Sequence, residues 1–170
     1  MAKLYMGFDA GTQSVKVAVY DENFNPVASH SLPTTLHYPQ PGWVQMNIDE
    51  FLNITVECMK KTVEAIKGKG YSPSDIAAVM GDGIICGICG VDENGKAVTP
   101  YINYLDSRTQ ADVDAINAKN LDIWGRETGN PEANCMFPAM FARWFLANSE
   151  DFRKKGVKFV HNLSLIHISE

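Results

Sequence analysis

The sequence predicts an α/β fold in which a mixed β-sheet is flanked by helices, and three observations point to it. The chain opens with β-rich segments separated by short turns, continues with one long amphipathic helical segment, and then returns to strand-like and helical segments. Its 170 residues, 45% hydrophobic and 21% charged, have the size and composition of an ordinary globular domain. This composition excludes a disordered tail and a disulfide-stapled mini-protein.

The first part of the chain is predicted to form an antiparallel meander of three strands. Residues 4–8 are apolar, residues 9–14 are turn formers, and residues 15–20 are again β-rich. After Asn25-Pro26, the segment 27–36 can form a third strand. Because a Rossmann unit needs a helix directly after its first strand, this order disfavours a Rossmann fold.

A loop and a long helix are predicted next. Two prolines and a glycine make the segment 38–43 irregular. Asn47 or Asp49 can then cap a helix whose apolar residues recur at helical spacing and which ends before Gly68.

A short capped turn at 72–75 is predicted to lead into two further strands. These are the strand-like runs 76–80 and 84–91, which the segment Gly81-Asp82-Gly83 is expected to interrupt. Residues 92–95 have the composition of a hairpin-type turn.

The last predicted elements are a strand and two helices. The strand is expected near residues 98–104, and the helices are expected over 107–116 and 134–148, the second of them amphipathic.

Charge and hydropathy exclude several classes of partner. The formal net charge is −5 and the sequence pI is about 5.3, with no long run of one sign, so binding to nucleic acid is not expected. No stretch approaches the roughly 18 apolar residues that a membrane helix needs, and the N-terminus lacks the pattern of a signal peptide. We therefore expect a cytoplasmic protein without a membrane partner.

The four cysteines offer one close pair, Cys86 and Cys89. Zinc or redox chemistry is one interpretation of this pair, but no second pair completes a metal site. Residues three apart along a strand point to opposite faces, so we favour small core residues.

The opening turn carries the residue types that metal-assisted phosphate binding needs. Glycine lets the backbone approach an anion, hydroxyl and N–H groups can donate to phosphate oxygens, Asp9 can hold hydrated Mg²⁺, and Lys16 adds positive charge. The expected phosphate- or ATP-binding residues are Asp9, Gly11, Thr12, Gln13, Ser14 and Lys16. Taken alone, the turn fits two interpretations equally well: a phosphate-binding loop, or a hairpin turn that Asp9 and Thr12 merely stabilise. It is not a P-loop, because it lacks the Gly-Lys-Ser/Thr ending.

Five groups of motifs in order resemble the N-terminal domain of the FGGY family of carbohydrate kinases, from residue 4 to about residue 160. They resemble, in turn, the family's first phosphate loop at 6–16, its Gly-Trp-Val-Glu segment at 41–45, its hairpin at 91–96, its strand ending in Trp-X-Asp-X-Arg at 101–108, and its later helices at 128–131 and 142–146. Each motif alone is weak, but their common order is specific.

The resemblance implies a ribonuclease H-like, actin-like ATPase fold, with residues 1–160 as the N-terminal lobe of a sugar kinase. It implies that Asp9 acts through Mg²⁺, by way of water, and that the turn faces the transferring phosphoryl group. The expected substrate-binding residues are Asp82, Tyr104, Asp106 and Arg108. Residues 161–170 match nothing expected there and are interpreted as a truncation or a foreign tail.

Alternatives remain for these substrate residues. Asp106 and Arg108 could form a surface ion pair that caps the next helix, although sugar binding is preferred. Asp82 could replace a missing polar group, although a solvated turn carboxylate is the favoured role. Trp43 could stack on a sugar ring, but burial of its loop is preferred.

Three departures from the family pattern bear on the substrate. Xylulose kinases of the family carry Gly-Gln-Met-His-Gly where this chain has residues 83–87, so two polar groups are replaced by apolar ones. Tyr104 stands in the position of the family's Trp, and Phe141 in that of a Lys. The sugar is therefore not simply xylulose, or the pocket is remodelled.

The sequence thus predicts ATP-dependent phosphorylation of a sugar or polyol hydroxyl, with ATP and Mg²⁺ as cofactors and a small-molecule substrate as partner. The general base is expected downstream of this chain, so no catalytic base is assigned here, and the chain alone is expected to be inactive. The alternatives are a non-catalytic sugar-binding or regulatory module, and another actin-like phosphotransferase such as an acetate or hexose kinase. If the protein associates with itself, we expect a homodimer.

Overall fold

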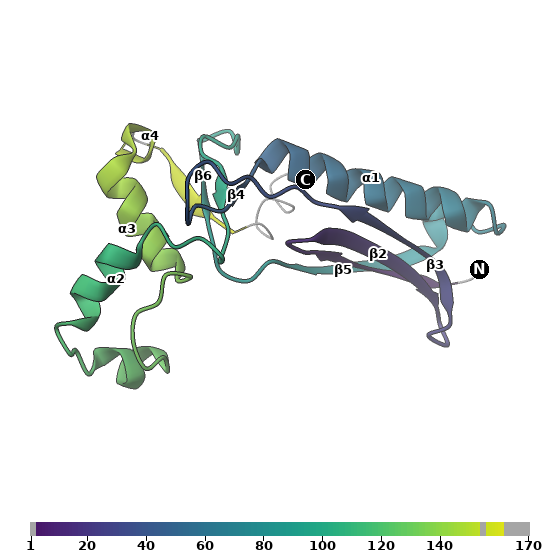
Figure 1. The fold of residues 1–170 in the computed structure, drawn as a ribbon. Coiled ribbons are helices and arrows are strands. Elements are labelled where there is room, and N and C mark those ends of the chain that lie inside the picture. The colour runs from purple at the N-terminus through teal and green to yellow at the C-terminus, as the bar shows by residue number, and fades with distance from the viewer. Residues whose placement is uncertain (1–2, 154–155, 162–170) are drawn as a thin grey trace. The chain divides into compact units, whose positions relative to one another are not determined.

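The computed structural model describes residues 3–153 and 156–161, which fall into two compact units (Figure 1). The first unit holds residues 3–36 and 48–84, and the second unit holds the rest of the described chain. Each unit has its own sheet pairings and its own buried core.

The first unit is a four-stranded mixed sheet with one long helix, as the sequence predicts. Its elements are β1 (Leu4–Ala10), β2 (Ser14–Asp21), β3 (Pro26–Pro33), α1 (Ile48–Lys67), the short 3₁₀ helix η1 (Pro73–Asp75) and β5 (Ile76–Gly83). The strand order is β3-β2-β1-β5, in which β1 pairs antiparallel with β2 and parallel with β5. The antiparallel meander is therefore confirmed, and the parallel partner makes the sheet mixed.

Helix α1 packs on β2 and β3 through its apolar side (Figure 1). Phe51, Cys58 and Ile66 are buried at helical spacing, and the Cys58 thiol lies 3.4 Å from the backbone oxygen of His30. The helix ends at Lys67, directly before Gly68, as predicted. The capped turn after it is also confirmed, because Ser72 and Asp75 form a reciprocal capping box.

The predicted break at Gly81-Asp82-Gly83 is wrong, because these residues continue β5. The ladder between β1 and β5 runs to the last pair, Ala10 with Gly83. Gly81 allows this because the Phe8 ring lies directly over it, where a larger residue would hold the two strands apart.

Replacing Gly81 with alanine is expected to lower the free energy of unfolding by about 1–3 kcal/mol, because overpacking forces side chains and backbone to shift. An added Cβ would lie 2.0 Å from Cζ of Phe8. The matched control is Gly7→Ala, since a Cβ on Gly7 meets nothing within 4 Å. Urea denaturation followed by far-UV circular dichroism measures both variants, and equal stability losses would contradict the close packing of Phe8 on Gly81.

The second unit contains short strands and helices. Its elements are β4 (Gln45–Met46), β6 (Cys89–Val91), β7 (Tyr101–Ile102), α2 (Gln110–Asn117), the π-helical turn η2 (Trp124–Thr128), α3 (Pro138–Asn148), α4 (Glu150–Arg153) and β8 (Lys158–Val160). Strand β4 pairs with β7, and β6 pairs with β8. The core includes Ile88, Ile102, Phe141, Phe145 and Phe152.

The elements of the second unit are shorter than the sequence predicts. The strand expected over 84–91 is limited to β6, because Cys86 and Gly87 have φ of 60° and 76° and leave the extended conformation. The helix expected from residue 134 starts at Pro138, since proline suits the first turn of a helix.

The strand expected near 98–104 forms only at β7, and the helix expected from residue 107 starts at Gln110. The turn at 92–95 is confirmed, with the Gly95 N–H donating to the Asp92 carbonyl at 3.1 Å.

Within the described part of the chain, no helix has both the length and the hydrophobicity required to cross a bilayer. The tail predicted at 161–170 lies outside the described residues, apart from His161.

Candidate functional site

The first candidate site is the tight turn between β1 and β2. The Gly11 N–H donates to the Ser14 carbonyl at 3.1 Å and closes the turn. Thr34, just after β3, donates from its hydroxyl to the Thr12 carbonyl at 2.5 Å and from its N–H to the Gln13 carbonyl at 3.1 Å. The residue that follows β3 thus fixes the turn, and Gln13 stays exposed.

Asp9 and Lys16 face each other across β1 and β2 at the start of this turn. They are register partners, and Lys16 Nζ lies 3.7 Å from Asp9 Oδ2. Their side chains are 47% and 65% exposed, so the pair contributes little to stability and both charges are open to a ligand.

The carboxylate of Asp9 lies close to the turn backbone. A Cβ placed on Gly11 would lie 3.3 Å from Asp9 Oδ1 and 3.0 Å from the Ser14 carbonyl oxygen. Glycine therefore keeps this space clear beside the carboxylate. The oxygen donor suits a hydrated hard cation such as Mg²⁺, although no group of three His, Cys, Asp or Glu residues in the described chain forms a complete metal cage.

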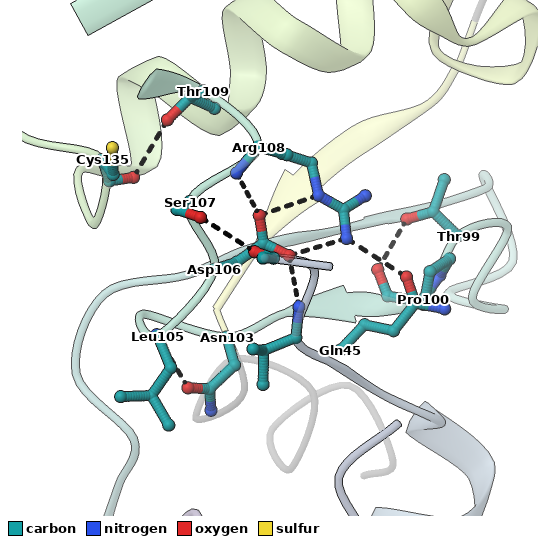
Figure 2. A network of polar contacts seen from close by, with 12 residues as sticks. Gln45, Thr99, Pro100, Asn103, Leu105, Asp106, Ser107, Arg108, Thr109 and Cys135 are labelled. Atoms are coloured by element: carbon teal, nitrogen blue, oxygen red, sulfur yellow. Dashed lines mark hydrogen bonds and ion pairs between the residues drawn. The ribbon is translucent and has the colours of Figure 1, made fainter. Parts of the chain in front are cut away.

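The second candidate site centres on the buried ion pair of Asp106 and Arg108 (Figure 2). Arg108 donates from Nε to Asp106 Oδ1 at 2.9 Å and from Nη2 to Asp106 Oδ2 at 2.8 Å. The Val44 N–H donates to Oδ2 at 2.6 Å, and Arg108 Nη2 also reaches Gln45 Oε1 at 3.2 Å. Both carboxylate oxygens are thus engaged within the protein.

Two indole rings enclose the Arg108 guanidinium. Its Cζ lies 3.9 Å from the ring centroid of Trp43 and 4.9 Å from that of Trp144. The side chains of Arg108 and Asp106 are 2% and 0% exposed, so the pair is no surface ion pair and presents no accessible polar surface. Trp43 packs on this cation and is half-buried, whereas residues 38–42 of its loop are exposed, so the predicted burial applies to the ring and not to the loop.

Tyr104 lies beside this pair, at a cavity of about 600 Å³. The cavity is also lined by Leu105, Gln110, Asn134 and Cys135, and Cys135 Sγ lies 3.0 Å from Gln110 Oε1. Sequence reasoning missed these neighbours of Tyr104. Leu105 directly follows Tyr104, whereas the other three come from α2 and from the segment before α3, and no motif spacing links these segments to Tyr104.

The expected substrate residues do not all meet in one unit. Tyr104, Asp106 and Arg108 belong to the second unit, whereas Asp82 is an exposed residue of β5 in the first unit. There Asp82 is the register partner of Asp9.

Comparison with known proteins identifies the family. The sequence profile of the FGGY family of carbohydrate kinases, N-terminal domain, matches residues 4–169. The chain belongs to this family. The resemblance found in the sequence motifs is thereby confirmed.

Curated relatives and solved structures of FGGY-type kinases agree with this assignment. The chain is 29% identical over 157 residues to a probable glycerol kinase of Caenorhabditis elegans, covering 89% of the chain and 31% of the relative. It is 30% identical over 164 residues to glycerol kinase 2 of Thermotoga maritima, with coverages of 92% and 31%. The chain thus spans about a third of the length of these relatives.

Solved kinases confirm the fold. The structure resembles the glycerol kinase of Plasmodium falciparum with ADP, at a TM-score of 0.84 and 23% identity over 97% of this chain and 33% of that one. It also resembles the xylulose kinase of Rhodospirillum rubrum, at a TM-score of 0.86 and 20% identity over 98% and 33%. The predicted actin-like α/β fold is therefore confirmed.

The close cysteine pair of this FGGY domain forms no metal cage within the described residues. All four cysteines are free, and Cys89 is fully buried, which fits a core residue. Cys86 is half-buried, and its carbonyl accepts a hydrogen bond from the Tyr101 hydroxyl.

Thiol labelling is expected to distinguish these cysteines. Burial raises the pKa of the Cys89 thiol to about 12, so at pH 8 it is protonated and shielded in the folded chain. We expect iodoacetamide to modify half-buried Cys135 well before Cys89, and to modify both in urea. Peptide mass spectrometry measures the order, and equal labelling rates in the folded chain would contradict the buried position of Cys89.

Proposed function

We propose that the chain supplies the phosphate loop and part of the substrate pocket of an ATP-dependent kinase that phosphorylates a sugar or polyol hydroxyl. The observation that carries the proposal is the fixed turn at Gly11–Ser14 beside the open carboxylate of Asp9, in a chain that belongs to the FGGY family. Oriented positive charge and hydrogen-bond donors around a phosphoryl group are what phosphoryl transfer requires.

The nucleotide side of the proposal rests on this turn and on a relative. The Plasmodium falciparum glycerol kinase, which the fold resembles, holds ADP. Asp9 would hold Mg²⁺ through water, and the metal would neutralise charge that develops on the phosphoryl oxygens. The side chains of Thr12, Gln13 and Ser14 would orient the terminal phosphate, Gly11 would leave room for it, and Lys16 would add positive charge.

The substrate side of the proposal rests on Tyr104 and the cavity beside it. The side chains that line this cavity carry hydroxyl, amide and carboxylate groups. These groups suit a polyol, which needs paired donors and acceptors. Because Asp106 and Arg108 are buried and paired with each other, we assign them a positioning role: they hold the Val44 segment in place. The names of the relatives, glycerol kinase and xylulose kinase, support a small polyol or sugar as the substrate.

A coupled assay of ADP formation tests the proposal. The full-length protein is expected to release ADP with one or more members of a panel of glycerol, pentoses, hexoses and sugar alcohols. The 170-residue chain alone is expected to stay at background, since positioning of both reactants, which contributes about 7–11 kcal/mol at best, needs groups beyond the turn and the cavity described here.

Calorimetry separates the alternative function. A full-length protein that binds a sugar but shows neither ADP formation nor any effect of nucleotide on sugar affinity would be a sugar-binding module, and the proposal would be wrong. Binding of sugar and nucleotide together with ADP formation would support the kinase.

A further inference from the structure

We infer that Asp82 acts with Asp9 on the phosphate side of the site, as a second carboxylate for the divalent cation, and not in the substrate pocket. This inference rests on the proposed function, because it adds a residue to the same metal-binding turn. Its basis is the register of β1 and β5, which are neighbouring parallel strands.

The register places the two carboxylates on one face of the sheet. Asp9 and Asp82 are Cα partners, and partners in neighbouring strands stand about 4.8 Å apart with side chains on the same side. Both residues lie near the carboxyl ends of their strands, where β1 enters the turn at Gly11. Two carboxylates at this spacing are within reach of one cation, directly or through its water.

The packing beneath β5 fixes this register. The Phe8 ring covers Gly81, and the Ile84 N–H donates to the Ala10 carbonyl at 3.2 Å, one position beyond the paired strands. These contacts flank Asp82 on both sides. A slip of one residue would turn Asp82 to the opposite face and push a side chain into the Phe8 ring.

Charge and space at the turn point to a cation as the ligand. Across the sheet, Asp82, Asp9 and Lys16 stand in one row, because Lys16 is the partner of Asp9 on β2. Lys16 offsets one negative charge, which leaves one uncompensated carboxylate beside the space that Gly11 keeps clear. A divalent cation with bound phosphate complements this row better than a neutral sugar does.

Binding of Mn²⁺ alone, as a paramagnetic substitute for Mg²⁺, tests the inference without any assay of activity. Electron paramagnetic resonance titration of the chain is expected to show a site that Mg²⁺ displaces. Asp82→Asn and Asp9→Asn are each expected to weaken Mn²⁺ binding about tenfold or more, because each removes one charged oxygen ligand. The control variant Asp122→Asn changes an exposed carboxylate of the second unit and is expected to bind as the unsubstituted chain does.

The outcomes separate this inference from the proposed function. A loss with Asp9→Asn alone, or no Mn²⁺ site in the unsubstituted chain, would overturn the role of Asp82, while ADP formation by the full-length protein would still support the kinase. A loss with Asp82→Asn alone would overturn the shared site and the role of Asp9. Far-UV circular dichroism confirms that each variant is folded.

Discussion

Replacing Asp106 with alanine is expected to lower the free energy of unfolding by about 3–5 kcal/mol, because it leaves a buried charge without its partner. The side chain of Arg108 is 2% exposed, its guanidinium would lose both hydrogen bonds to the carboxylate, and the Val44 N–H would lose its acceptor. Such a loss is a large fraction of the stability of a typical domain. Urea denaturation followed by tryptophan fluorescence measures it, since Trp43 and Trp144 lie against Arg108.

The matched control is the ion pair of Asp112 and Arg143 in the same unit. Arg143 Nε lies 2.9 Å from Asp112 Oδ1, but the Asp112 side chain is 29% exposed and the Arg143 side chain is 61% exposed. We expect Asp112→Ala to cost less than about 1 kcal/mol, as exposed pairs usually do. If the free energy of unfolding falls equally in the two variants, burial of the Asp106 pair does not make it more stabilising than an exposed pair. The positioning role of Asp106 would then be wrong.

Replacing Asp9 with asparagine in the full-length protein is expected to lower kcat about 100-fold or more, because metal-assisted charge stabilisation acts in the transition state. The sugar KM is expected to change little, since the proposed role of Asp9 is to hold the metal ion beside the phosphoryl group and not to contact the sugar. Steady-state kinetics at saturating ATP measure both constants. The asparagine keeps the size and the polarity of the side chain and removes its charge.

Asp122→Asn serves as the control for the loss of a carboxylate at an exposed position. A rise in the sugar KM with an unchanged kcat would assign Asp9 to the sugar-binding site. The proposal that the turn faces the phosphate would then be wrong. Equal kinetics for Asp9→Asn and Asp122→Asn would exclude a role for Asp9 in phosphoryl transfer.

Local patterns predicted much of the first unit. The apolar period of 48–67 defines one helix face, and the Ser72 to Asp75 spacing defines a capping box; both depend on residues a few positions apart. The break at Gly81-Asp82-Gly83 failed as a prediction because glycine marks either a turn or a close approach, and the Phe8 ring decides between them.

The sequence by itself determined the meander, the long helix, the turn between β1 and β2 and, through the order of its motifs, membership of the FGGY family. Only the tertiary structure decided that Asp106 and Arg108 form a buried pair, with Arg108 against Trp43 and Trp144, and that Asp82 stands beside Asp9. The physical reason is the range of the interactions. Helix periodicity and caps are set by neighbours along the chain, whereas ion-pair burial and strand register depend on packing between segments far apart in sequence.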